Sequence, residues 1–203
     1  MTPLKFLQQR KEYSGKEVIK KVISKKKQMV EEAREKAKSS PYHGCATAVF
    51  TAVADVLGLK HGDEVFKAMI GLAGGTGHFT KGTCGCLTGA TAAISLSYDL
   101  DRQEVLRLVN DPKELHPEDP RMPKVFQEIF DKTAEVARRI EEKYGGILCS
   151  DVQFKIYGKT LDILDPKKHW EFCQAFRSFP VCCFDVEADV AGWAVETILK
   201  GKS

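Results

Sequence analysis

Apolar residues recur every three to four positions along most of the chain, which is the spacing of one face of an α-helix. The first such segment covers residues 15–39, and Ser14 with Glu17 fits a capping box at its start. Pro41 restarts the chain in a second segment that Gly58 ends, with a buried stripe that opens at Cys45. These two segments predict two consecutive helices.

The same period continues to the C-terminus, interrupted by glycine and proline. Helices are expected at 63–72, 84–98, 101–109, 123–144, 150–157, 166–176 and 183–199, the shorter ones as accessory elements. The sequence shows neither an alternating strand pattern nor an internal repeat. It therefore predicts an all-α fold of about seven helices, with a four-helix-bundle-like core, short accessory helices and an N-terminal amphipathic helix.

Composition divides the chain of 203 residues into two parts. Residues 1–40 carry 12 basic and 5 acidic side chains and are expected to form a basic helical arm. Residues 41–203 are expected to form one cysteine-containing helical domain. The basic side chains alternate with apolar ones at helical spacing and have no series of aromatic residues for base stacking, so we expect no binding to nucleic acid.

Location and redox state follow from the apolar runs and the cysteines. No run approaches the length of a membrane span and the first residues lack the apolar core of a signal peptide, so we expect a cytoplasmic protein without a membrane partner. The chain has seven cysteines, an odd number in a compartment where disulfides seldom persist. This indicates metal or redox chemistry rather than a disulfide scaffold.

Most of the cysteines lie near predicted helix ends. Cys45 and the Cys84/Cys86 pair lie at helix starts, Cys149 follows the end of a helix, and Cys182-Cys183 precedes another. In an antiparallel bundle such ends can gather at one pole, where helix N-termini stabilise thiolates that suit zinc or an iron-sulfur cluster.

Two further cysteine observations limit this interpretation. Cys173, within WEFCQAF, is expected to be a buried thiol that packs as a small apolar residue. A Cys-x-x-Cys-His motif does not occur, which excludes covalent haem attachment of the usual c type.

The ordered blocks HGCATAV, GLAGGTGHFTKGTCGCLTGA, EKYGGILCSDV and CCFDVEADVAGWAVETIL resemble the C-GCAxxG-C-C family of redox-active proteins over about residues 41–200. The resemblance assigns the family's four cysteines to Cys45, Cys84, Cys149 and either Cys182 or Cys183. The family is similar to the helical domain of split-Soret cytochrome c, which implies a bundle that binds a 2Fe-2S cluster. The haem of that relative is not carried over.

The chain departs from the family pattern in two places. Cys86 stands where the pattern has alanine after Cys84-Gly85, and the last block has the pair Cys182-Cys183. Helical periodicity turns Cys86 toward the core and places Cys84 at the cap. Cys86 and Cys182 remain alternative ligands.

The first functional hypothesis is a 2Fe-2S protein for electron transfer or redox sensing, with Cys45, Cys84, Cys149 and Cys183 as ligands. The backbone amides of the glycine loop are expected to bind the sulfurs, at Gly75, Gly77, Gly82 and Gly85. A redox partner protein and a homodimer are expected.

Two alternatives belong to other classes of protein. One is a thiol-disulfide protein that uses Cys84/Cys86 or Cys45/Cys84, and the other is a non-catalytic module that binds zinc or another metal. No catalytic residue is identified from the sequence, so whether the protein is an enzyme stays open.

Overall fold

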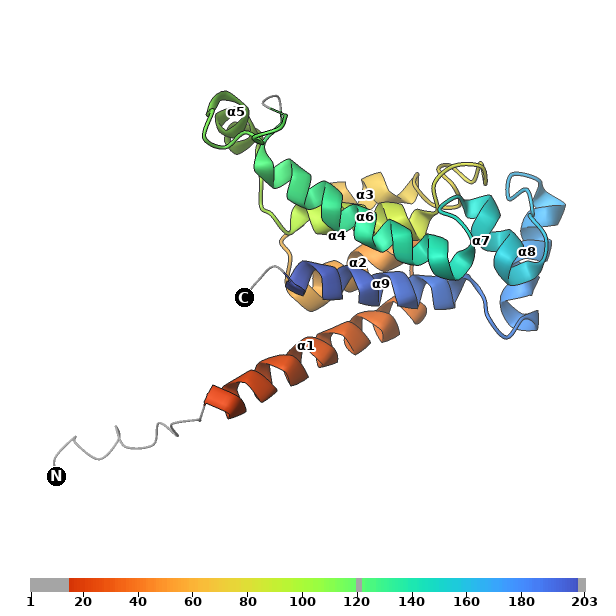
Figure 1. The fold of residues 1–203 in the computed structure, drawn as a ribbon. Helices are drawn as coiled ribbons and strands as arrows, with labels where there is room; N and C mark the ends of the chain where they lie inside the picture. The colour runs from red at the N-terminus through yellow and green to blue at the C-terminus, as the bar shows by residue number, and fades with distance from the viewer. Residues whose placement is uncertain (1–14, 120–121, 201–203) are drawn as a thin grey trace.

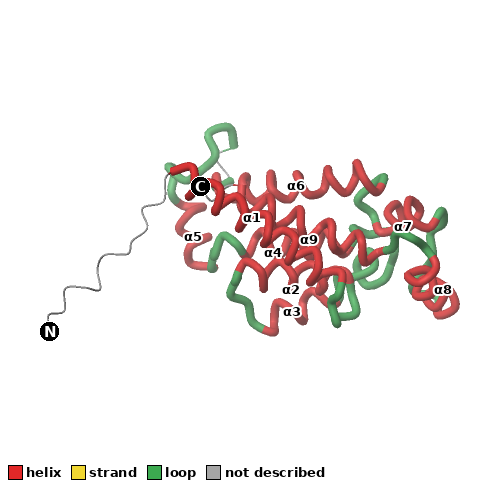
Figure 2. Tube along the Cα trace, turned by 90° about the horizontal axis from the view of Figure 1, so that it is seen from below, coloured by secondary structure: helices red, strands yellow, loops and turns green. Residues whose placement is uncertain are grey.

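The computed structural model describes residues 15–119 and 122–200, and it consists of helices joined by loops in these ranges (Figures 1 and 2). Its helices are α1 (Gly15–Lys38), α2 (Cys45–Leu57), α3 (Asp63–Ile70), α4 (Gly85–Leu96), α5 (Arg102–Asn110), α6 (Lys124–Tyr144), α7 (Cys149–Tyr157), α8 (Pro166–Ser178) and α9 (Cys183–Lys200). The β contacts of the described ranges are two isolated bridges. The all-α prediction is confirmed, and each of these helices overlaps a range in which the sequence predicted one.

Helix α9 lies at the centre of the bundle and contacts α1, α2, α4 and α6 (Figure 1). Two polar contacts show that α1 and α9 pack antiparallel, because each joins an earlier part of one helix to a later part of the other. Lys26 donates to the carbonyl of Leu199 at 2.9 Å, and Lys38 pairs with Asp185 at 2.6 Å. Helices α1 and α9 therefore run in opposite directions.

Helix α2 is enclosed by its neighbours, because every residue from 46 to 54 is buried. Small side chains permit this burial, since alanines and threonines alternate with valines and a single Phe50. Gly58 ends the helix in the left-handed conformation, with φ 63°, a region that glycine adopts without a steric penalty. Helix α2 thus carries Cys45 at one end of a closely packed interior.

Only the second half of α1 joins the core. Ala33 and Ala37 are fully buried, whereas Val22 and Ile23 are 49% and 50% exposed. The first turns of α1 extend past the end of α9 (Figure 1), and Val22 and Ile23 accordingly stay half exposed. The predicted cap Ser14 lies outside the described residues. A division into an arm and a domain near residue 40 stays a prediction.

A partly buried carboxylate joins three helices through hydrogen bonds near the middle of α9. Asp189 accepts hydrogen bonds from Arg34 of α1 at 2.5 Å, from the Tyr144 hydroxyl of α6 at 2.6 Å, and from Lys143. Burial alone would raise the pKa of Asp189, but its three donors outweigh that effect and lower it. Asp189 therefore remains charged in the folded protein.

Within the described residues, none of the helices combines the length and the apolar composition that crossing a bilayer requires.

Candidate functional site

Four cysteines begin four different helices at the same end of the bundle. Cys45, Cys149 and Cys183 are the first residues of α2, α7 and α9, and Cys84 is the N-cap of α4. The unpaired N-H groups at a helix N-terminus favour a negative charge, so each position stabilises a thiolate.

The position of Cys149 differs from the one that the sequence suggested. The chain turns at Gly145, with φ 83°, and a new helix starts at Cys149. Cys149 therefore opens α7 instead of trailing the end of α6.

A short backbone ladder holds the start of α7 against the loop before α4. The amide of Cys84 donates to the Ile147 carbonyl at 2.8 Å, and the amide of Cys149 donates to the Gly82 carbonyl at 3.0 Å. Thr83 and Leu148 form an isolated bridge between these bonds. Residues far apart in sequence are thus joined by main-chain bonds, which brings the N-termini of α4 and α7 together.

Cys45, Cys86 and Cys84 form a contiguous group of thiols. The Cys86 side chain is hydrogen-bonded to both Cys45 and Cys84, and it is 1% exposed. The contact with Cys86, followed by the amide of Gly74, lowers the pKa of Cys45 to about 7. The contact with Cys45 raises the pKa of Cys86 well above its usual value. Within this pair the interaction favours the thiolate at Cys45 and the neutral thiol at Cys86.

The glycine loop between α3 and α4 supports Cys45 in a way that the sequence did not predict. The amide that reaches the Cys45 sulfur belongs to Gly74, whereas the Gly77 amide donates to the Gly71 carbonyl at 2.7 Å within the loop. Gly77 is therefore not a donor to sulfur. Thr76, His78 and Thr80 have φ values of 63°, 61° and 65°, a conformation that is costly for side chains with a β-carbon.

The other three glycines predicted to bind the cofactor allow close packing. A β-carbon on Gly75 would lie 2.9 Å from the backbone of Thr80, and one on Gly82 would lie 2.9 Å from the Gly75 carbonyl carbon. A β-carbon on Gly85 would overlap the Cys45 sulfur. Glycine at 85 thus leaves the space that the Cys45 thiol occupies.

Gln153 and Tyr157, both on α7, bind two of the cysteines. Gln153 is fully buried, donates to the Cys149 sulfur at 3.4 Å and accepts from the Leu161 amide at 2.9 Å. The Tyr157 hydroxyl donates to the Cys183 sulfur at 3.5 Å and accepts from the Cys183 amide at 3.1 Å. Sequence reasoning missed both residues, although each follows Cys149 at a multiple of one helical turn.

The electrostatic neighbours of these two thiols are the other helix-terminal cysteines. Burial raises the pKa of Cys149 to about 12, and Cys84 and Cys45 raise it further. Burial likewise raises the pKa of Cys183 well above its usual value, with contributions from Cys84, Cys45 and Cys149. All four thiols therefore share one electrostatic environment.

Cys182 is directed elsewhere. Its amide donates to the Asp185 carboxylate at 2.9 Å, and its sulfur lies 3.6 Å from the same oxygen. It packs in a small apolar cluster with Tyr157 and Ala175. Of the pair at the start of α9, Cys183 is thus the one whose thiol interacts with the other helix-terminal cysteines.

A buried carboxyl group also belongs to the site. Glu187 lies one turn after Cys183 on α9 and is 6% exposed. Burial, followed by the proximity of Cys45 and Cys84, raises its pKa well above the usual value. Burial and the nearby thiols therefore favour the neutral form of the Glu187 carboxyl. Its i+4 spacing from Cys183, on a face lined by Val186 and Val190, is the sequence signal that could have identified it.

The expectation for Cys173 is tested by its position. Cys173 is exposed, so its prediction as a buried thiol is wrong. Helix α8 packs through Phe172 and Ala175, which turns Cys173 to the other face. His78 contacts His169 edge-on, with ring centroids 5.5 Å apart.

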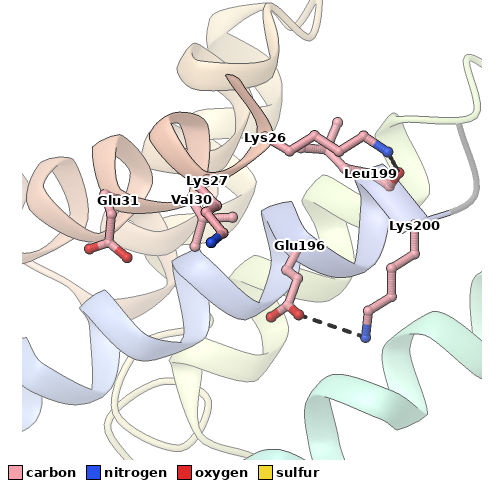
Figure 3. Close-up of a pocket in the computed structure, with 7 residues that line it drawn as sticks. All are labelled: Lys26, Lys27, Val30, Glu31, Glu196, Leu199 and Lys200. Carbon is pink, nitrogen blue, oxygen red and sulfur yellow. Dashed lines mark hydrogen bonds and ion pairs between the residues drawn. The ribbon is translucent and has the colours of Figure 1, made fainter. Parts of the chain in front are cut away.

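A surface groove of 460 Å³ lies between α1 and the end of α9 (Figure 3). It is lined by Lys26, Lys27, Val30, Glu31, Glu196, Leu199 and Lys200. Because Lys200 and Cys183 stand at opposite ends of α9, about 25 Å apart at 1.5 Å per residue, the groove is separate from the thiols.

The described residues include no group of three or more His, Cys, Asp or Glu side chains arranged to hold a single metal ion. The donor set nevertheless suits a thiolate-bound group, because four cysteines stand at helix N-termini that favour the charged form. A two-iron cluster takes two thiolates on each iron, so its four ligands need not converge on one ion.

Fold and site together define a helical protein with a buried cluster of thiols at the N-terminal ends of its helices. The family model described as "Putative redox-active protein (C_GCAxxG_C_C)" matches residues 43–197. The chain belongs to this family of redox-active proteins. Comparison with curated proteins and with solved structures finds no match, so the similarity to split-Soret cytochrome c stays a prediction.

Proposed function

We propose that the protein binds an iron-sulfur cluster of the 2Fe-2S type through Cys45, Cys84, Cys149 and Cys183, and that it transfers electrons to a redox partner protein. The observation that carries the proposal is the position of these four thiols at four helix N-termini, where main-chain dipoles stabilise the charge of thiolate ligands. The bound cluster would supply one-electron chemistry.

The surrounding residues support this assignment in two ways. Gly74, Gln153 and Tyr157 each donate a hydrogen bond to a ligand sulfur, and such bonds raise the reduction potential of a cluster. All seven cysteines are free thiols, as the proposal requires of a protein in a reducing compartment such as the cytoplasm.

Anaerobic reconstitution with ferrous iron and sulfide tests the proposal. The full-length protein is expected to turn brown and to contain iron and acid-labile sulfide in equal amounts. Serine variants of the four proposed ligands are expected to lose the cluster, while Cys173→Ser and Cys182→Ser retain it. The proposal is wrong if the reconstituted protein stays colourless and free of iron, or if it contains zinc without sulfide.

Size-exclusion chromatography with light scattering of the same samples tests the expected homodimer. A mass of about twice 22.6 kDa would support it, and a single-chain mass would refute it.

A further inference from the structure

Cys86 is the one thiol of the buried group that the proposed cluster does not use. It is the second residue of α4, it is almost fully buried, and its side chain contacts Cys45 on one side and Cys84 on the other. Packing alone does not require a thiol here, because an apolar alanine would fill the same core position. The contact of Cys86 with two other thiols therefore suggests a chemical role.

Main-chain packing holds Cys45 and Cys86 together. Helices α2 and α4 approach so closely that a β-carbon on Gly89 would overlap the Ala46 carbonyl, and one on Gly85 would overlap the Cys45 sulfur. Backbone atoms set the separation of the two helices here. The side chains of Cys45 and Cys86 therefore stay next to each other without a bound metal to hold them together.

Exposure distinguishes the roles of the two sulfurs. Cys45 is partly exposed, whereas Cys84 and Cys86 are buried. Cys45 is thus the residue of the three that solvent touches, and Cys86 lies behind it. Cys84 also contacts Cys86, but a disulfide between residues only two positions apart would close a small, strained ring, which makes this the less stable pairing.

We propose that Cys45 and Cys86 form a thiol-disulfide exchange couple, in which Cys45 attacks and Cys86 resolves. The Cys45 thiolate attacks a low-molecular-weight disulfide, forms a mixed disulfide and releases one thiolate. The Cys86 thiol then gives its proton to the released thiolate and attacks the Cys45 sulfur, which forms the Cys45–Cys86 disulfide and expels the second thiolate. Two cysteine thiols are oxidised and one small disulfide is reduced to two thiols.

This activity is distinct from cluster binding. The disulfide and the cluster cannot exist in the same molecule at the same time, because a Cys45 sulfur in a disulfide cannot ligate iron. The couple replaces the Cys84/Cys86 and Cys45/Cys84 pairs expected from the sequence. It requires no metal, so it can be tested on the full-length protein without iron.

To test this, reduced and chelator-washed protein is treated with oxidised glutathione and the reaction is quenched with acid. The free thiols are then alkylated, and the peptides are mapped without reduction of disulfides. The wild-type protein is expected to link residues 39–60 to residues 82–102, with Cys84 alkylated and Cys45 and Cys86 protected. The Cys86→Ala variant is expected to lose the link and to accumulate glutathione on Cys45. Cys84→Ser is expected to form the link, and the control Cys173→Ser is expected to form it at the wild-type rate.

Two results would overturn the inference: a wild-type protein that retains glutathione on Cys45 without forming the link, or a Cys86→Ala variant that links Cys45 to Cys84 at the wild-type rate. Circular dichroism of Cys86→Ala and Cys86→Ser confirms that the variants are folded. Reconstitution of Cys86→Ala with iron and sulfide separates the two proposals, since this variant keeps all four proposed ligands and is expected to load normally.

Discussion

The close approach of α2 and α4 predicts an unequal response of two helical glycines to the same substitution. A β-carbon on Gly89 would overlap the Ala46 carbonyl oxygen and lie 3.1 Å from the carbonyl carbon, so it would press on backbone. A β-carbon on Gly192 would lie 2.7 Å from the guanidinium of Arg34, the end of a flexible side chain. Both glycines are buried within helices, which makes Gly192→Ala a matched control for Gly89→Ala.

The expected change in the free energy of unfolding is the sum of a favourable change in helix propensity and an unfavourable steric contact. Alanine in place of glycine stabilises a helix interior by about 1 kcal/mol in both variants. In Gly89→Ala the two helices must separate by on the order of 1 Å to restore contact distances, and overpacking of this kind costs about 3 kcal/mol, the upper end of its range. In Gly192→Ala the Arg34 side chain rotates, which weakens its pair with Asp189 by about 1 kcal/mol. The net loss is therefore about 2 kcal/mol for Gly89→Ala and near zero for Gly192→Ala.

Thermal unfolding followed by circular dichroism measures the difference. For a chain of this size a loss of 2 kcal/mol lowers Tm by about 4–8 °C. The metal-free, reduced proteins are compared at pH 7, so that neither cluster loading nor a disulfide contributes. If Gly89→Ala melts at or above the temperature of Gly192→Ala, then α2 and α4 do not approach as closely as the structure shows.

Three further predictions concern buried polar groups. Asp189→Asn is expected to lose about 2–3 kcal/mol at pH 7 and to flatten the pH dependence of Tm. The donors of Asp189 lower its pKa, so the stability that its carboxylate contributes is present above about pH 4 and is lost as the pH falls through the folded-state pKa. If the Tm of the wild-type protein and the Tm of Asp189→Asn are both unchanged between pH 7 and pH 3, the prediction is wrong. Gln153→Leu leaves the Leu161 amide without its acceptor, so unfolding by urea is expected to show a loss of about 1–3 kcal/mol. Tyr157→Phe removes the donor to the Cys183 sulfur and is expected to lower the reduction potential of the reconstituted cluster, measured by redox titration; a raised potential would refute that role.

The helices could be predicted from the sequence because their apolar faces are regular. Periodicity located α2, α4, α6 and α9, and the C-terminal glycines marked the ends of α2 and α6. It failed for the first turns of α1, where the apolar residues Val22 and Ile23 extend beyond the core. Periodicity reports which face is apolar, whereas burial depends on whether a neighbouring helix reaches that face.

The site was predictable only in part, because its partners are set by tertiary contacts. Cys149 was assigned to a helix end since its N-cap, Leu148, lacks the polar side chain that marks a helix start. Gln153 and Tyr157 act on sulfurs through their position on α7, and the Tyr157 contact spans 26 positions in the sequence. No local pattern encodes such a contact.

The two proposals meet at Cys45, which is a ligand of the proposed cluster and the attacking thiol of the proposed couple. Cys45 and Cys86 stand on α2 and α4, whose separation is fixed where Gly89 meets the Ala46 backbone. Cys149 and Cys183 accept hydrogen bonds from Gln153 and Tyr157 of α7, and main-chain bonds of Cys84 and Cys149 tie the start of α7 to the loop before α4. Each of these contacts is present without a cluster. Loss of iron would therefore leave Cys45 beside Cys86, where the proposed disulfide can close.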